Sequence, residues 1–466
     1  MPNCAILGGF MLRAVIVLSV GAATLIAPAP GFSAQEEPPE PEVVLVGKGF
    51  GHGVGMAQDG AYAMARAGAS ATDILTTFYP GTSIGQRSGS VRVNVLDAPV
   101  SEVVLSFPSG GEVGERGGAG QSPGLPVTIR PGGSLRVSSD GGYRVTPLDR
   151  ADLRRSTPPE TTPAEPVAGS ALWAVSRDDA SVVLPELGKR YRGTVQVQAA
   201  GGGLQLVNHL DVEDYLRGIS EVPSSWPAAA QQAQAIAART YALRFAAAGQ
   251  PLCSSQQCQV YAGQTAESGA KDIAVAATAG QVVTYEGRLA ETVYSASAGG
   301  VSATAEEGFG PGSPEFAYLQ AVPYPTEDPH PWEERMTLRR LAAVARYPGE
   351  VADVTVTRTG PSGRPLEITF TGDADALAVD AHTLADRLDL QSTFFTIRVE
   401  RPAPAAGDPV AVAAPAPGVA ERRHAPVVLQ AGAEDGRLGR TPWIAFALVL
   451  VVVVALAAKS CVARTP

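Results

Sequence analysis

The chain has 466 residues, 45% of them hydrophobic and 18% charged, so it can bury a large core, and its length is compatible with two or three domains. The formal net charge is −10 and no block of Lys and Arg stands out, which disfavours binding to nucleic acids and attraction to anionic polymers. We therefore expect a neutral or weakly charged partner.

Residues 1–34 have the pattern of a secretory signal peptide. Arg13 precedes an apolar run, and small residues precede the acidic, Pro-rich segment that begins at Gln35. This pattern predicts that the protein is exported. A retained N-terminal anchor is the alternative, because Phe32 is a poor residue three positions before a cut after Ala34.

Glycines alternate with other residues over 47–55. Along an extended strand this spacing removes the side chains from one face and lets another backbone or a flat ligand approach closely. No register gives a G-x-G-x-x-G or Walker pattern, so the stretch is not a nucleotide-binding loop. His52 lies within it and either contacts a substrate or forms hydrogen bonds within the core. It has no nearby partner for a metal site.

A short helix is predicted after Ser70. Ser70 and Asp73 resemble a capping box, and Ile74, Leu75 and Phe78 share the inner face of the helix. We expect these three apolar side chains in the core rather than on a binding surface.

Residues 91–207 alternate between apolar and polar side chains in short runs that Gly, Pro and Ser separate, which is typical of β-strands. They form a β-rich domain or an elaboration of the core sheet. The stretches 108–123 and 155–168 are expected to be exposed loops. With the helices on either side, the predicted fold class is α+β.

A long Ala-rich helix is predicted to end near Ala248. Ser224 or Ser225 can cap it, Pro227 suits its first turn, and Gly249 follows its end. Few charges occur on any face, which indicates a buried helix that packs closely on several sides.

Glu221 lies just before this helix, beside Trp226, on a rigid turn. A carboxyl group in that place can be partly desolvated and kept protonated, as a general acid requires. The alternative is an acid that stabilises the N-terminus of the helix dipole.

Two cysteines lie in the part predicted to be exported. Cys4 falls in the leader and Cys461 beyond a C-terminal apolar run, which leaves Cys253 and Cys258. In an oxidising compartment two cysteines this close indicate a disulfide that closes a small loop.

The C-terminal third begins with a helix at 337–346 and β segments that end at Glu400, with another helix before the last segment. Residues 401–442 have the composition of a linker. The uncharged run at 443–458 is about 24 Å long as a helix and can cross a bilayer if Lys459 snorkels. A buried core helix is the alternative.

Several strings resemble the SpoIID/LytB domain family. YLRGISEVPSSWP, AQAIAARTYAL, CQVYAG and YSASAGG follow one another within about 205–400, and GHGVGMAQ lies at 51–58. In typical members the last motif closes the domain, so its early position here resembles a circular permutation. We therefore expect residues 43–58 to pack beside the strand at 394–400.

The resemblance implies a role for each matched residue. Glu221 takes the place of the family's catalytic acid. Substrate contacts are implied for Arg239, Tyr241, Ser295, Ser297, His52 and Gln58, although Arg239 and Tyr241 can also serve only to pack the helix. Some members bind zinc with a His beside the second Cys. Gln257 stands there in this chain, so neither a metal nor another cofactor is expected.

Enzymes of this family are lytic transglycosylases, a type of lyase that cleaves peptidoglycan after N-acetylmuramic acid and leaves a 1,6-anhydro end. One carboxyl group suffices for that chemistry, unlike the pair in most glycoside hydrolases. The neighbouring acids Asp211, Glu213 and Asp214 are expected to face solvent. A serine nucleophile is disfavoured because no G-x-S-x-G elbow occurs.

The sequence thus predicts an exported, membrane-tethered protein that acts on peptidoglycan glycan strands and binds no nucleic acid. The alternative is a non-catalytic module that binds peptidoglycan and modulates a cell-wall amidase. The predicted order is a signal peptide (1–34), the Gly-His-Gly segment (43–90), a β-rich region (91–204), a SpoIID-like domain (205–400), a linker (401–442), a transmembrane helix (443–458) and a cytoplasmic tail (459–466).

Overall fold

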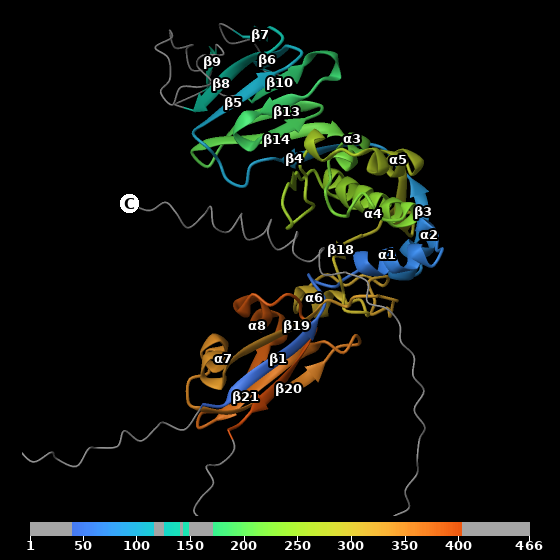
Figure 1. The fold of residues 1–466 in the computed structure, drawn as a ribbon. Helices are drawn as coiled ribbons and strands as arrows, with labels where there is room; N and C mark the ends of the chain where they lie inside the picture. The colour runs from blue at the N-terminus through green and yellow to red at the C-terminus, as the bar shows by residue number, and fades with distance from the viewer. Residues whose placement is uncertain (1–39, 116–124, 140–142, 149–170, 403–466) are drawn as a thin grey trace, which may run out of the picture. The chain divides into compact units, whose positions relative to one another are not determined.

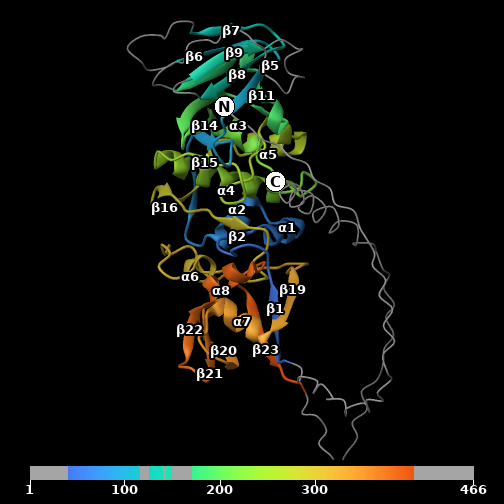
Figure 2. The same cartoon turned by 90° about the vertical axis from the view of Figure 1, so that its left-hand side faces the viewer.

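The computed structural model describes residues 40–115, 125–139, 143–148 and 171–402 (Figures 1 and 2). These residues form a strand-rich mixture of sheets and helices, which confirms the α+β class. The predicted signal peptide, the transmembrane segment, the tail and the stretch 155–168 lie outside them. Among the described helices, none has the length and apolar character needed to span a membrane.

Two sheets in the β-rich part share one core. The seven-stranded sheet has the order β15-β4-β14-β13-β10-β6-β7, with β15 parallel to β4. Its strands are β4 (Ser90–Asn94), β6 (Gly111–Glu115), β7 (Val127–Ile129), β10 (Leu172–Ser176), β13 (Thr194–Ala200), β14 (Gly203–Asp211) and β15 (Leu252–Cys253). The second sheet, in the order β12-β11-β5-β8-β9, consists of β5 (Glu102–Phe107), β8 (Gly133–Ser139), β9 (Tyr143–Leu148), β11 (Val182–Leu184) and β12 (Lys189–Tyr191).

Side-chain alternation places these strands as expected. In β13, for example, Val195 and Val197 are fully buried while Gln196 between them is half-buried. The expectation of a loop over 108–123 is wrong in part, because Gly111–Glu115 forms β6 and pairs with both β10 and β7. Four of its five positions are Gly or Glu, so this short run carried little apolar signal.

Helix α4 (Ala228–Ala247) packs against elements on several sides, as its low charge predicted. It contacts α1 (Gln58–Arg66), α2 (Ala71–Phe78), α3 (Val212–Arg217), α5 (Gly269–Ala277), β4 and β16 (Gln281–Tyr285). Alanine side chains allow this close approach. The expected Ser cap is wrong, because Pro227 occupies the N-cap position and no side chain caps the helix.

Smaller elements complete this region. β16 lies between β3 (Ser83–Gln86) and β17 (Arg288–Leu289), and β18 (Tyr294–Ser295) pairs with β2 (Met56–Ala57). The predicted capping box at Ser70 is confirmed, and Ile74, Leu75 and Phe78 of α2 are fully buried. Within the part of the chain that the structure describes, 3₁₀ turns occur at Arg177–Asp179, Pro185–Leu187 and Gln264–Ala266.

The first described strand belongs to the C-terminal part of the fold. β1 (Glu42–Lys48) is the central strand of the sheet β19-β1-β23 and runs antiparallel to β23 (Phe395–Glu400), which Figure 1 shows as a blue strand among orange ones. The expected packing of this segment on residues 394–400 is confirmed for β1. The remaining elements are α6 (Ala305–Phe309), β19 (Pro331–Thr337), α7 (Leu338–Ala345), β20 (Val351–Thr359), β21 (Pro365–Gly372), β22 (Leu377–Asp380) and α8 (Ala381–Leu388).

The glycine segment after β1 is not an extended strand. Gly49, Gly51, Gly53 and Gly55 all have left-handed φ angles, between 70° and 96°. The expectation of one stripped strand face is therefore wrong, and the glycines are needed for backbone conformation. Close approach does occur, since Phe50 exchanges backbone hydrogen bonds with Ser297 at 2.8 and 3.2 Å.

Candidate functional site

Glu221 is held between α3 and α4 by a neighbouring loop. The Ser220 N–H donates to the Val260 carbonyl at 2.9 Å, and the Val260 N–H donates to Glu221 Oε1 at 2.5 Å. A bridge between Ile219 and Tyr261 extends this pairing. Backbone pairing with the loop at Val260 therefore positions Glu221, and the Val260 N–H holds one oxygen of its carboxyl group.

The Glu221 side chain lies in a pocket formed mainly by α3, α4 and α5. The lining residues are Leu216, Ile219, Glu221, Val222, Gln231, Gln234, Ala235, Ala238, Lys271 and Val275. Burial in this apolar setting raises the pKa of Glu221, while the Val260 N–H, the Gln58 side chain and the charge of Lys271 act against that rise. Burial prevails, so the carboxyl group retains a proton to higher pH than an exposed glutamate.

Gln58 connects the glycine segment to this pocket. It begins α1 and is buried, and its Nε2 donates to Gln234 Oε1 of α4 at 3.2 Å. Its side chain also forms a hydrogen bond with Glu221 that lowers the pKa of the acid. Residues far apart in sequence thus meet at one carboxyl group.

Lys271 is a site residue that the sequence did not single out. Its Nζ donates to the carbonyl of Ile219 and, at 2.8 Å, to that of Ala266. Burial lowers the pKa of Lys271, while Asp272, Glu267 and Glu221 raise it. It lies on α5 outside the matched strings, so no sequence signal marked it.

A hydrogen-bonded chain of polar side chains also lies near Glu221. Tyr215 donates to Gln259 Oε1 at 2.7 Å, and Gln259 Nε2 donates to the Tyr294 hydroxyl at 2.9 Å. Burial raises the pKa of Tyr215 and Tyr294, and in both the charge of Glu221 adds to that rise. Gln259 and Tyr294 belong to the strings CQVYAG and YSASAGG, which offered a signal that residue-by-residue selection missed.

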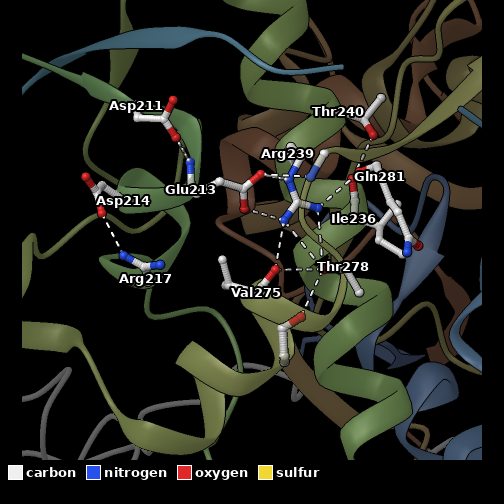
Figure 3. Close-up of polar contacts among 12 residues, drawn as sticks. Asp211, Glu213, Asp214, Arg217, Ile236, Arg239, Thr240, Val275, Thr278 and Gln281 are labelled. Carbon is white, nitrogen blue, oxygen red and sulfur yellow. Dashed lines mark hydrogen bonds and ion pairs between the residues drawn. The ribbon is translucent and has the colours of Figure 1, made fainter. Parts of the chain in front are cut away.

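Arg239 does not face the site but is fully buried in a closed ion pair (Figure 3). Its Nε and Nη2 donate to the two carboxylate oxygens of Glu213 at 2.8 and 2.7 Å, and Nη1 donates to the Gln281 carbonyl at 3.0 Å. A substrate contact for Arg239 is therefore not available in this structure. The expectation that Glu213 faces solvent is wrong in part, because Glu213 is half-buried and turned toward Arg239.

Two other acids near Glu221 are also engaged. Asp211 caps α3 by accepting from the Glu213 N–H at 2.8 Å, and Asp214 accepts from Arg217 at 2.8 Å on the surface. Figure 3 shows Glu213 turned toward Arg239 and Asp214 turned toward Arg217. None of the three lines the Glu221 pocket.

Tyr241 is half-buried and stacks on Phe245 with ring centroids 4.9 Å apart. Burial, together with the charges of Glu291 and Glu221, raises its pKa to about 12. The phenol of Tyr241 therefore stays neutral at pH 7, and it lies close enough to Glu221 to feel the charge of its carboxylate.

Ser295 and Ser297 are both buried. Ser297 Oγ donates to Asp59 Oδ2 at 2.8 Å, and Asp59 also accepts from Thr326 at 2.8 Å. Ser297 is thus committed to an internal network, whereas Ser295 Oγ has no hydrogen-bond partner among the described residues. Asp59 was not foreseen, although it directly follows the matched Gln58.

His52 forms internal contacts. Its Nδ1 accepts from the Val54 N–H at 3.0 Å, and its ring lies 4.7 Å from that of Phe309. Burial lowers the pKa of His52 to about 4, so the ring is neutral at pH 7. It is half-buried, which leaves both expected roles open.

Cys253 and Cys258 are joined by a disulfide, with Cα atoms 5.5 Å apart, in the loop that precedes Val260. Within the described parts of the chain, no group of three or more His, Cys, Asp and Glu side chains is arranged to hold a metal ion.

Residues 200–285 match the model of the family described as Stage II sporulation protein, SpoIID. The resemblance to this family is confirmed. The matched segment runs from β14 to β16 and contains Glu221 and its pocket. The Gly-His-Gly segment lies outside it.

Three relatives are similar to this chain. An "Uncharacterized protein" of Brachyspira hyodysenteriae is 28% identical over 224 residues, covering 45% of this chain and 60% of the relative. Stage II sporulation protein D of Bacillus subtilis is 28% identical over 152 residues, 28% of this chain and 42% of the relative. The Amidase enhancer of Bacillus subtilis is 55% identical over 40 residues, 9% of this chain and 6% of the relative. The chain thus spans less than two thirds of each relative. No solved structure matches it.

Proposed function

We propose that this chain is an extracytoplasmic lytic transglycosylase that cleaves peptidoglycan glycan strands, with Glu221 as its acid and base. The observation that supports this most is the setting of Glu221, whose pKa burial raises inside a pocket of the family-matched segment. A general acid must hold its proton near the working pH, and a desolvated carboxyl group does so.

In the proposed reaction Glu221 donates its proton to the oxygen that leaves C1 of N-acetylmuramic acid. The C1–O bond breaks as the C6 hydroxyl oxygen of the same sugar bonds to C1. The proton of that hydroxyl passes to the Glu221 carboxylate, which restores the acid. No water is consumed, and the product carries a 1,6-anhydro end.

The environment of the neighbouring acids supports a mechanism with one carboxyl group. Glycoside hydrolases usually place two carboxyl groups on either side of the bond. Here Glu213 is paired with the buried Arg239, and Asp214 is paired with Arg217. Neither acid lines the Glu221 pocket, so neither is placed to act as a second carboxyl group there.

We also propose that residues 1–34 export the protein and that residues 443–458 tether it to the membrane, which would place the pocket at the cell wall. The arginine and lysine residues that flank the second segment give a weak orientation signal, so export by the leader decides the topology.

The deciding experiment is mass spectrometry of fragments released from purified glycan strands, intact and peptide-stripped, by the full-length protein. We expect anhydro-ended products that disappear with Glu221→Gln, a loss of at least about 10²-fold in rate. Glu213→Gln is not a suitable control because it breaks a buried ion pair, so Asp214→Asn serves as the matched acid variant. Products that persist in Glu221→Gln would remove the mechanism.

A second candidate is a non-catalytic module that holds glycan and modulates a cell-wall amidase. The short 55% match to a protein named Amidase enhancer favours it. In that case neither substrate yields anhydro-ended fragments, glycan is still retained in a pulldown, and addition of the protein changes the rate of a purified amidase.

A further inference from the structure

One face of α1 leads outward from Glu221. Gln58, Tyr62 and Arg66 are spaced four residues apart, so they follow one another along the same side of the helix. Gln58 is buried and forms a hydrogen bond with Glu221, Tyr62 is half-buried, and Arg66 is exposed. The stripe therefore runs from the acid to the surface.

Tyr62 meets Trp226 from the turn that follows Glu221. Their ring centroids are 5.0 Å apart and their planes are inclined by 48°. The Trp226 ring packs on Tyr62 of α1 and does not line the Glu221 pocket, although the two residues share one turn. Helices α3, α4 and α5 supply most of that lining. Both rings are half-buried, which leaves part of their surfaces accessible to a ligand.

The pair is held from both sides. The Trp226 N–H donates to the Pro223 carbonyl at 3.2 Å, and the Trp226 carbonyl accepts from Gln231 at 2.7 Å. Arg66 lies over Tyr62, 5.8 Å from the ring centroid, and donates to Glu327 at 2.8 Å. Two fixed rings lose little freedom when a ligand binds, and this favours affinity.

We propose that Tyr62 and Trp226 form an aromatic platform on which a sugar ring of the glycan strand packs, next to the sugar that Glu221 acts on. The proposal rests on the proposed site at Glu221. The C–H faces of a pyranose are apolar and match aromatic faces, while its hydroxyl groups match the polar ends of Tyr and Trp. A glycan strand also fits the neutral or weakly charged partner that the charge of the chain favours.

The platform would act on the rate as well as on affinity. Binding energy from sugars remote from the broken bond can be used to position the reacting sugar, so short fragments that do not reach the platform should lose turnover rate. Tyr62 and Trp226 are thus positioning residues, which do not touch the reacting atoms.

The test measures binding without cleavage, in full-length protein that carries Glu221→Gln, with peptide-stripped glycan strands as the probe. Trp226→Leu and Tyr62→Leu should each weaken binding about tenfold or more, while Trp226→Phe, which keeps a ring, should lose less. Tyr285→Leu is the control, because Tyr285 is also half-buried and stacks on Tyr318 at 4.8 Å, in the β16–β17 hairpin. Thermal unfolding checks each variant, and Tyr62→Leu decides the question if Trp226→Leu does not fold.

Unchanged binding in the leucine variants would overturn the platform, as would a Glu221→Gln parent that retains no glycan. The binding and cleavage assays can therefore reject the platform and the transglycosylase independently of each other. Binding that depends on Trp226 in a protein that never yields anhydro ends supports the platform and rejects the transglycosylase. Cleavage by the otherwise native chain that is unaffected by Trp226→Leu supports the transglycosylase and rejects the platform.

Discussion

Helix α4 contributes to two carboxylate sites that satisfy charge in opposite ways. At one site Arg239 of α4 donates two hydrogen bonds to Glu213 and further bonds to backbone carbonyls, so the pair is complete. At the other site Gln231, Gln234 and Ala235 of α4 help to line the pocket around Glu221, which lacks an arginine partner there.

The two sites differ in what surrounds the carboxyl group. Glu213 is half-buried and accepts two parallel, charge-assisted hydrogen bonds from Arg239. Burial instead raises the pKa of Glu221, against hydrogen bonds from Val260 and Gln58 that lower it. Both acids lie in the same short stretch of sequence, yet only Glu221 lines the pocket.

The largest expected effect on stability is at the ion pair between Arg239 and Glu213. Arg239→Met leaves Glu213 without its partner at a largely buried position, so the free energy of unfolding should fall by about 3–5 kcal/mol. Urea unfolding followed by circular dichroism measures it. Arg217→Met removes an exposed pair and should change stability by less than about 1 kcal/mol. A similar small change for Arg239→Met would mean that the pair is not structural.

At the Glu221 pocket, replacing the acid with the neutral Gln should stabilise the fold at high pH, the opposite of the effect of Arg239→Met. Because the pKa of Glu221 is raised in the folded state, that state favours the protonated acid, and native stability is lost as pH rises through this pKa. Glu221→Gln abolishes this loss. Its unfolding free energy relative to the native chain should therefore increase from pH 4 to pH 8, in paired urea titrations. A relative decrease would show that Glu221 is a stabilising carboxylate like Glu213.

The smallest expected effect sharpens the role of Gln58. Its hydrogen bond lowers the pKa of Glu221, so Gln58→Leu should raise that pKa and move the alkaline limb of the pH–rate profile toward higher pH. The plateau rate should change less than about tenfold, since one hydrogen bond is lost and the acid remains. Gln231→Leu, at another position of the same pocket, is the control. An alkaline limb at the same pH in Gln58→Leu as in the native chain would show that Gln58 only packs α1 against α4.

Sequence patterns predicted well those features that depend on neighbours in the chain. The capping box at Ser70 and the buried face of α2 were correct, as was the burial of the Ala-rich α4. The position of Glu221 before α4 followed from its motif, and pairing of β1 with β23 followed from the displaced glycine motif. Each rests on local spacing or on a resemblance that spans a short string.

Predictions failed where distant residues decide. The alternating glycines looked like an open strand face, but left-handed backbone angles set their role. The family motif implied a substrate contact for Arg239, with helix packing as the alternative, and its enclosure required α3 and α5 to pack beside α4. Nothing local distinguishes such an arginine from one that faces a cleft.

The sequence by itself therefore predicted the candidate acid, the helix behind it and the family that both resemble. Only the tertiary structure decided which charges are enclosed and which are exposed to the pocket. The physical reason is that the state of an ionisable group depends on desolvation and on partners within a few ångströms, and these come from other parts of the chain. Gln58, Lys271 and Val260 reach Glu221 from three separate segments, and no pattern in any one of them reveals the other two.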